Sequence, residues 1–225
     1  MAIILNIETA TEISSVCIAS GKNILSIKES EEPMVHTKET TRLIESCLKQ
    51  AGLKIEQLEA VAVSSGPGSY TALRVGSSVA KGICYAQDIP LLGISTLQSL
   101  ALGASTIHKG DFYCPMIDAR RKEVYLEIYN NMMTSVSACT PQILTLEFIE
   151  ELAEKGRIIF VGNGAAKFAT MSTRPNFIFT NILCSAKHLV PLSAEAFERK
   201  NFADTAYFEP LYLKPPNITT SKKRL

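Results

Sequence analysis

The chain has 225 residues, of which 46% are hydrophobic and 20% charged, and its formal net charge is +1. This length suits one large domain or two small lobes, and the near-neutral charge gives no overall attraction to nucleic acid or acidic membranes. Six cysteines without a C-x-x-C pair indicate reduced, packed thiols rather than a disulfide framework. The sequence shows no basic signal-peptide region and no apolar run of about 18 residues, so we expect a cytoplasmic protein.

The first half of the chain predicts elements in the order β-β-β-α-β-α. The expected strands are short and apolar, and they are Ile3–Glu8, Ser14–Ala19, Asn23–Lys28, Ala60–Ser64 and Leu91–Ser95. The expected helices carry apolar residues at helical spacing, and they are His36–Ala51, Tyr70–Ala86 and a helix ending near Gly103. Strands alternating with helices indicate an α/β protein with a mixed sheet. This element order is typical of an actin-like or sugar-kinase-like lobe of ribonuclease-H type.

The second half predicts another set of alternating elements. Its expected strands are Phe112–Asp118, Glu123–Tyr129 and Arg157–Val161, and its expected helices are Leu146–Glu154, a short one after Gly164, and Ala186–Arg199. We therefore predict two lobes, with residues 1–103 forming the N-terminal lobe, completed by the tail 206–225. Residues 104–205 form the second α/β lobe.

A glycine-rich loop follows the strand that ends at Ser64. Gly66 and Gly68 permit a tight turn, and Ser69 or Thr71 can cap the helix that follows. The free N–H groups of a helix N-terminus also suit an anion. The loop is neither a P-loop nor a complete G-x-G-x-x-G, so a turn with a cap is favoured over a phosphate cradle.

The helix after this loop has few charges and many small residues. Its interior glycines, Gly76 and Gly82, each cost about 1 kcal/mol relative to alanine, so close packing must offset them. One face can pack on its own sheet. The other is either an open surface that awaits a partner or is buried within the lobe, and the sequence leaves both alternatives open.

Several sequence blocks, taken together and in order, resemble the TsaB (YeaZ) family. The loop and helix start resemble its G-P-G-S-[FY]-T-x-[LI]-R-[IV]-G stretch, and a later segment resembles its D-A-R-R-x-E-V-Y hairpin. The matching blocks are Ile7–Thr9, Ser64–Gly76, Gly93–Leu97, Asp118–Tyr125 and Pro210–Leu213. They span nearly the whole chain.

The resemblance implies a two-lobed actin-like fold and a non-catalytic subunit of the machinery that forms N6-threonylcarbamoyladenosine in tRNA. It implies a heterodimer with TsaD, the catalytic paralogue, assembly with the ATPase TsaE, contact with tRNA through the complex, and a homodimer where TsaD is absent. It also implies an interface built from the first two helices. The residues nominated for that interface are Leu43, Cys47, Val79, Ala80 and Ile83. The motif residues nominated for complex function are Gly66, Gly68, Ser69, Arg74, Asp118, Arg120, Arg121 and Glu123.

Catalytic residues of the paralogue have no counterparts here. Aligned with its H-x-x-x-H metal pair, this chain has Thr96 and Leu100, and leucine cannot coordinate a metal. Where actin-like ATPases place D-x-G-[ST], the chain has Glu8-Thr-Ala-Thr11, with a β-carbon at Ala10 in place of glycine. Glu8 also replaces the aspartate usual in the family. We therefore expect no cofactor on this chain alone, with ATP, ADP and metal belonging to partner subunits.

Two rival functions remain: a free-standing sugar-kinase-like ATPase and a metal-dependent glycoprotease-like peptidase. The missing glycine counts against the first and the missing histidine pair against the second. Arg120 and Arg121 form either a solvated turn or a pair aimed between the lobes to hold a phosphate or a partner carboxylate. The basic tail from Lys214 is either disordered or assists tRNA binding.

Overall fold

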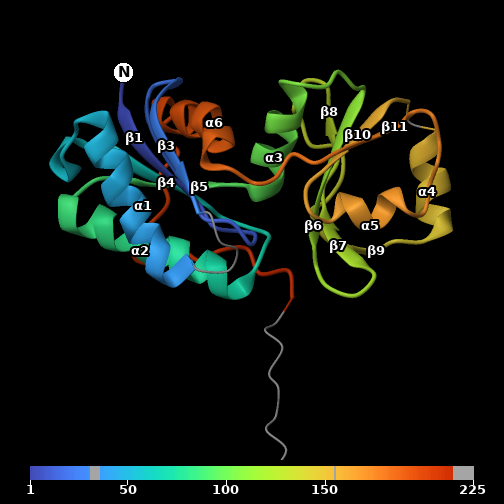
Figure 1. Ribbon diagram of the computed structural model, residues 1–225, viewed down its shortest axis with the longest axis horizontal. Coiled ribbons are helices and arrows are strands. Elements are labelled where there is room, and N and C mark those ends of the chain that lie inside the picture. Colours follow the sequence, from blue (N-terminus) through green and yellow to red (C-terminus); the bar gives the residue numbers. More distant parts are fainter. Residues whose placement is uncertain (31–35, 155, 215–225) are drawn as a thin grey trace, which may run out of the picture.

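A computed structural model describes residues 1–30, 36–154 and 156–214, which form two mixed sheets flanked by helices (Figure 1). The first sheet and its connections comprise β1 (Ile3–Glu8), β2 (Ser15–Ser20), β3 (Asn23–Glu29), α1 (His36–Ala51), the 3-10 turn η1 (Ile55–Gln57), β4 (Ala60–Ser64), α2 (Tyr70–Gln87) and β5 (Leu91–Ile94). The predicted order β-β-β-α-β-α is confirmed, and most boundaries lie within one residue of those expected.

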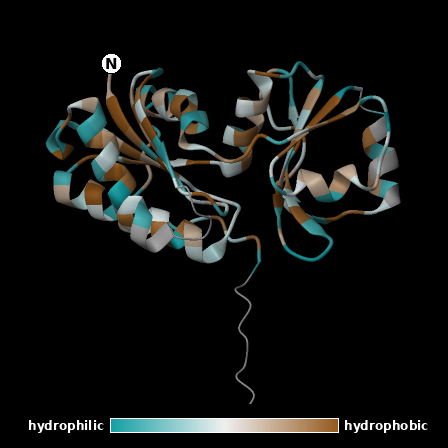
Figure 2. Cartoon of the chain, in the orientation of Figure 1, coloured by the Kyte–Doolittle hydropathy of each residue, from teal (hydrophilic) through white to brown (hydrophobic). Residues whose placement is uncertain are grey.

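The first sheet has the strand order β3-β2-β1-β4-β5. β1 pairs antiparallel with β2 and β2 with β3, whereas β1, β4 and β5 run parallel. The inner strands are buried on both faces, so apolar residues predominate in β1 and β4. Figure 2 shows this as hydrophobic colouring along the strands. Three antiparallel strands followed by two parallel ones form the ribonuclease-H-type arrangement, so the predicted fold class is confirmed.

The second sheet has the order β11-β10-β6-β7-β9, with β8 paired to β6. The elements of this half of the chain are, in order, α3 (Thr96–Ser105), β6 (Phe112–Asp118), β7 (Glu123–Leu126), β8 (Tyr129–Asn130), β9 (Thr140–Ile143), α4 (Leu146–Ala153), β10 (Ile158–Val161), α5 (Ala165–Ala169), β11 (Phe177–Thr180) and α6 (Ala186–Glu198). One core on this sheet is aromatic, because Phe160 contacts the rings of Phe168, Phe177 and Phe179. No helix in the described part of the chain is long and apolar enough to cross a membrane.

Two helices, α3 and α6, do not pack on the sheet that their place in the chain predicts. Each packs on the other sheet. α3 was expected in the N-terminal lobe, but it packs on β6 and β10 of the second sheet. α6 was expected within 104–205, but it packs on β1, β2, β4 and β5 of the first sheet, opposite to α1 and α2 (Figure 1). The boundary at residue 103 is revised accordingly, because each sheet buries its second face under a helix from the other half of the chain. Of the tail 206–225, only residues 206–214 are described, and they lie along the first sheet and α2.

The sequence missed two strands and merged two others. β9 contains Pro141, and β11 is only four residues long, so neither carries a strong alternating pattern. The strand expected over Glu123–Tyr129 is split into β7 and β8 around Glu127 and Ile128. The expected cap residue Ser69 stands at the N-cap of α2, but its side chain makes no capping hydrogen bond.

Candidate functional site

The glycine-rich loop after β4 packs against the end of β1. The backbone N–H of Ser69 donates to the carbonyl of Ala10 at 2.7 Å, and a β-carbon on Gly68 would overlap Ala10. Gly66 has φ +94° and lies against the backbone of Leu211, whose N–H donates to Ser65. The loop is thus closed by contacts within the chain on both sides.

Glu8 lies buried at the end of β1, directly beneath this loop. One carboxyl oxygen accepts a hydrogen bond from the Ala10 N–H at 2.7 Å, while Oε2 has no partner. Burial raises the pKa of Glu8 to about 7, although hydrogen bonds from Ala10 and Ser64 act in the opposite direction. Near neutral pH this carboxyl group is therefore partly protonated, which makes it a poor ligand for a metal ion.

The positions aligned with the paralogue's metal ligands lie in the core. Thr96 begins α3 and Leu100 follows one turn later, and both are fully buried. Leu100 packs among Ala101, Ile117 and Ile159. The described residues contain no group of three or more histidine, cysteine, aspartate or glutamate side chains that could hold a metal ion. The residues present at these positions therefore do not fit a metal.

An apolar groove lies between α1 and α2, which run side by side on the outer face of the first sheet (Figure 1). Its volume is about 590 Å³. We call it the α1–α2 groove, and its lining residues are Thr41, Ile44, Glu45, Leu48, Leu53, Lys54, Ile55, Val79, Gly82 and Ile83. Most of these residues are aliphatic, and the aliphatic side chains are half-buried except for Ile44, which is buried. The charged Glu45 and Lys54 are exposed. An uncovered aliphatic groove of this kind is typical of a surface that binds another protein.

The structure separates the five residues nominated for the interface. Val79 and Ile83 line the groove, and Leu43 is half-buried nearby on α1 without lining it. Cys47 and Ala80 are fully buried against their own sheet, where the Cys47 thiol donates to the carbonyl of Val16 at 3.3 Å. Their nomination was wrong, because these two side chains face inward from their helices.

The two interior glycines of α2 face opposite environments. A β-carbon on Gly76 would overlap the Thr9 hydroxyl group, so close packing within the chain accounts for this glycine. A β-carbon on Gly82 would meet no atom within 4 Å, and Gly82 is exposed on the wall of the α1–α2 groove. Nothing in the described chain offsets the helical cost of Gly82.

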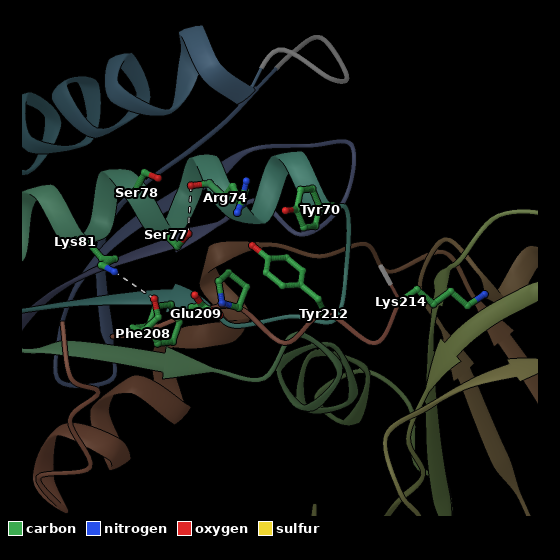
Figure 3. A pocket seen from close by; sticks show the side chains of 10 residues that line it. Tyr70, Arg74, Ser77, Ser78, Lys81, Phe208, Glu209, Tyr212 and Lys214 are labelled. Carbon is green, nitrogen blue, oxygen red and sulfur yellow. Dashed lines mark hydrogen bonds between the residues drawn. The ribbon is translucent and has the colours of Figure 1, made fainter. Parts of the chain in front are cut away.

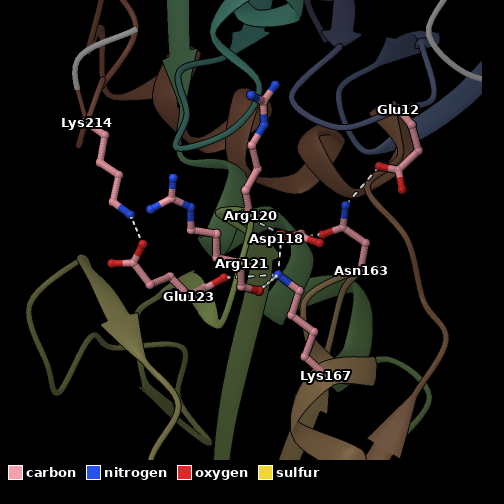
Figure 4. A network of polar contacts seen from close by, with 8 residues as sticks. All are labelled: Glu12, Asp118, Arg120, Arg121, Glu123, Asn163, Lys167 and Lys214. Atoms are coloured by element: carbon pink, nitrogen blue, oxygen red, sulfur yellow. Dashed lines mark hydrogen bonds and ion pairs between the residues drawn. The ribbon is translucent and has the colours of Figure 1, made fainter. Parts of the chain in front are cut away.

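The turn between β6 and β7, which we call the Asp118–Glu123 turn, brings the four nominated motif residues together (Figure 4). Arg120 and Arg121 have φ values of +68° and +52°. The acids are paired with lysines: Asp118 with Lys167 at 2.5 Å, and Glu123 with Lys214. Both arginine side chains are exposed and, among the described residues, have no hydrogen-bonding or ion-pair partner.

A second groove separates α2 from the C-terminal segment (Figure 3). This α2–C-terminal groove has a volume of about 570 Å³ and is lined by Tyr70, Arg74, Ser77, Ser78, Lys81, Phe208, Glu209, Pro210, Tyr212 and Lys214. The Arg74 guanidinium group lies 4.7 Å from the centre of the Tyr70 ring, and the ring centres of Tyr70 and Tyr212 are 4.6 Å apart. Arg74 is therefore a groove residue, whereas Gly66, Gly68 and Ser69 shape the loop before it.

Comparisons with known proteins decide the family. The model of the family described as "TsaD: tRNA N6-adenosine threonylcarbamoyltransferase" matches residues 33–221. A protein of Buchnera aphidicola from Schizaphis graminum, named tRNA threonylcarbamoyladenosine biosynthesis protein TsaB, is 31% identical over 73% of this chain and 80% of its own length. The chain belongs to the TsaB family. The TsaB of Haemophilus influenzae is 29% identical over 98% of this chain and 96% of its own length.

A solved structure of YeaZ from Pseudomonas aeruginosa confirms the fold of this TsaB family member. It superposes with a TM-score of 0.80 over 95% of this chain and 100% of its own, at 24% sequence identity.

Sequence reasoning missed several contacts that shape the site. Lys167 and Asn163 each reach Asp118, and the Asn163 side chain also donates to Glu12 at 2.9 Å, which links loops of the two sheets. The Lys214 ion pair with Glu123 makes a second link. The G-N-G sequence around Asn163 was the available signal, since it marks a loop at the end of β10, but it does not identify the partner of the asparagine.

Proposed function

We propose that this chain is a non-catalytic subunit of a tRNA N6-threonylcarbamoyladenosine-forming complex, in which it binds and activates TsaD and helps recruit TsaE and tRNA. The α1–α2 groove carries this proposal, because it is an uncovered aliphatic surface on the two helices that the TsaB resemblance assigns to pairing. We place the protein in the cytoplasm, where it forms a homodimer through the same surface when TsaD is absent.

Gly82 supports helix-to-helix docking at this groove. Only hydrogen occupies its side-chain position, so the backbone of an incoming helix can approach α2 closely there. Val79 and Ile83 flank it on the same face and supply aliphatic contacts, while Glu45 and Lys54 are available for polar contacts with the partner. An apolar centre with polar residues around it is the usual composition of a protein interface.

Two places in the chain support a non-catalytic role: the loop where an actin-like ATPase would bind phosphate, and the positions where the paralogue would hold a metal. Ala10 occupies the space beside Gly68, and the Ser69 N–H is already bonded to the Ala10 carbonyl, so this backbone donor is not available to a phosphate. Thr96 and Leu100 offer no metal ligand pair. We propose that ATP, ADP and metal are held by the partner subunits.

Reconstitution of tRNA threonylcarbamoylation from purified components tests this function. TsaD and TsaE are supplied with tRNA and the activated threonylcarbamoyl donor, with and without this chain, and the modified nucleoside is measured. We expect modification only when the chain is present. Equal modification without it would show that the proposed role is wrong. Calorimetric titration of the lone chain with ATP tests the rival ATPase function, for which micromolar binding would be the decisive result.

A further inference from the structure

The backbone of the Asp118–Glu123 turn holds two arginines in a conformation that arginine disfavours. Consecutive non-glycine residues with φ of +68° and +52° are strained, and such strain persists only where other contacts impose it. Here the Arg120 N–H donates to Asp118 Oδ1 at 2.6 Å, and Lys167 Nζ donates to the Arg121 carbonyl at 2.8 Å. These contacts fix the backbone of the turn and leave both guanidinium groups unused.

The nearby charges are arranged so that the arginines stay available. Asp118 forms an ion pair with Lys167, and Glu123 forms one with Lys214. Neither acid pairs with Arg120 or Arg121, although both arginines lie in the same turn. Both arginine side chains instead project away from the hairpin (Figure 4). Guanidinium groups recognise phosphate and carboxylate with paired donors, so this arrangement presents two strong anion-binding groups.

Lys214 connects this turn to the α2–C-terminal groove, because it lines the groove and also pairs with Glu123. Across the turn, the side chains that contact it and the groove, there are seven cations and four carboxylates, a net charge of +3 where the whole chain carries +1. The cations are Arg74, Lys81, Arg120, Arg121, Lys122, Lys167 and Lys214, and the acids are Glu12, Asp118, Glu123 and Glu209. We call this surface the basic strip.

Aromatic rings accompany the cations in the groove. Tyr70 and Tyr212 are half-exposed and contact each other, and Arg74 lies over the Tyr70 ring. Proteins bind RNA strands by placing cations beside the backbone phosphates and aromatic rings beside the bases. An acidic protein segment would use the cations but not the rings, so the combination favours RNA.

We propose that the basic strip binds the tRNA substrate directly, with Arg120 and Arg121 on backbone phosphates and the Tyr70–Tyr212 pair beside a base. This inference rests on the proposed function, because it takes the RNA to be the substrate of the complex. It assigns to this chain an RNA contact of its own, separate from the α1–α2 groove on the other side of α2.

The test measures binding of an unmodified tRNA transcript to the isolated chain and to its complex with TsaD, at salt concentrations from 50 to 200 mM. The variant carries Arg120→Gln and Arg121→Gln, and a charge-matched control carries Lys22→Gln and Lys109→Gln, both exposed and outside the strip. Each phosphate contact contributes roughly 0.7–0.9 to the slope of log affinity against log salt concentration. The arginine variant loses two such contacts, so we expect its slope to be shallower by about 1.5, and we expect no change in the control. The affinity of the arginine variant should fall about tenfold or more.

A second pair of variants tests the ring contact. Tyr212→Ala should weaken tRNA binding about tenfold, whereas Tyr212→Phe should retain it, because the phenyl ring still stacks. Wild-type affinity and slope in the arginine variant would overturn the proposal. The proposal would also be overturned if the arginine variant lost as much affinity for TsaD, measured without RNA, as it lost for tRNA. That result would identify the turn as a protein contact. If the isolated chain shows the expected differences but wild type does not bind TsaD, the strip stands and the proposed function fails.

Discussion

Thr9 fills the space beside Gly76. A β-carbon at Gly76 would overlap the Thr9 hydroxyl group, which donates to the carbonyl of Ala72 at 2.8 Å. The end of β1 and the middle of α2 are therefore locked together at this point, and the glycine is required by the chain itself. Gly82, farther along the same helix, has no such neighbour. Gly76 is therefore needed for the folding of the chain, whereas Gly82 leaves open space on α2 that a partner can fill.

The same substitution at these two glycines should therefore have opposite effects. Gly82→Ala should stabilise the isolated chain by up to about 1 kcal/mol, because alanine is the better helix former and its methyl group meets open space. Gly76→Ala should destabilise it, because Thr9 must move. Urea unfolding of both variants measures the two changes. Stabilisation by Gly76→Ala would contradict the packing described here.

Ile83→Glu should weaken binding to TsaD by at least about tenfold, because it places a charge in the centre of an apolar surface. The matched control is Ile107→Glu, since Ile107 is 66% exposed and does not line the groove. Surface-based binding measurements and the thermal midpoint of each variant provide the readout. Equal affinity of the Ile83 variant and the control would place the interface elsewhere.

Glu8 should give folding stability a distinctive dependence on pH. Its pKa is raised from 4.5 to about 7, so the folded chain retains a proton that the unfolded chain has lost. This stabilisation is complete below pH 4.5 and is lost as the pH rises through about 7. Relative to Glu8→Gln, the wild type should lose up to about 3 kcal/mol of unfolding free energy over that interval.

The comparison must be made between these two proteins, because His188 acts in the opposite direction. Burial lowers the pKa of His188 to about 4, so its contribution is lost as the pH falls from 6.5 toward 4. Both proteins carry His188, and its effect cancels in their difference. Urea unfolding at pH values from 4 to 8 gives the two curves. Parallel curves would mean that Glu8 is ionised in the folded state.

The cysteines should be slow to alkylate in the native protein. Burial raises the pKa of Cys84 to about 11 and that of Cys139 to about 11, and it raises the pKa of Cys114 further. Cys139 is the one of the six that is only half-buried, so it should react first. Mass spectrometry after timed exposure to iodoacetamide, with a denatured sample as control, measures the order. Early modification of Cys114 would contradict the buried core.

The fold was largely predictable because its signals are local. The alternation of apolar strands and amphipathic helices fixed the order of elements, and α1 and β4 were predicted with their observed boundaries. β9 and β11 were missed because the first contains Pro141 and the second is short. The packing of α3 and α6 could not be predicted, since the periodicity of a helix shows that one face is buried but does not name the sheet that buries it.

The candidate surfaces were predicted in part. The helices α1 and α2 were identified, but a stripe of apolar residues on a helix spans both the core side and the groove side, and so Cys47 and Ala80 were nominated with Val79 and Ile83. Arg120 and Arg121 were singled out by their motif. Their freedom from the neighbouring acids depends on Lys167 and Lys214, which lie far away in sequence.

The exchange of α3 and α6 between the two sheets means that this polypeptide has no single point at which it divides into autonomous pieces. A protease cut near residue 104 would separate the first sheet from α6, exposing Ile4 and Leu92 to water. The same cut would take α3 away from the second sheet. Each fragment would then carry a bare apolar face that only the other fragment covers, so the two pieces should recover their structure by recombining rather than alone.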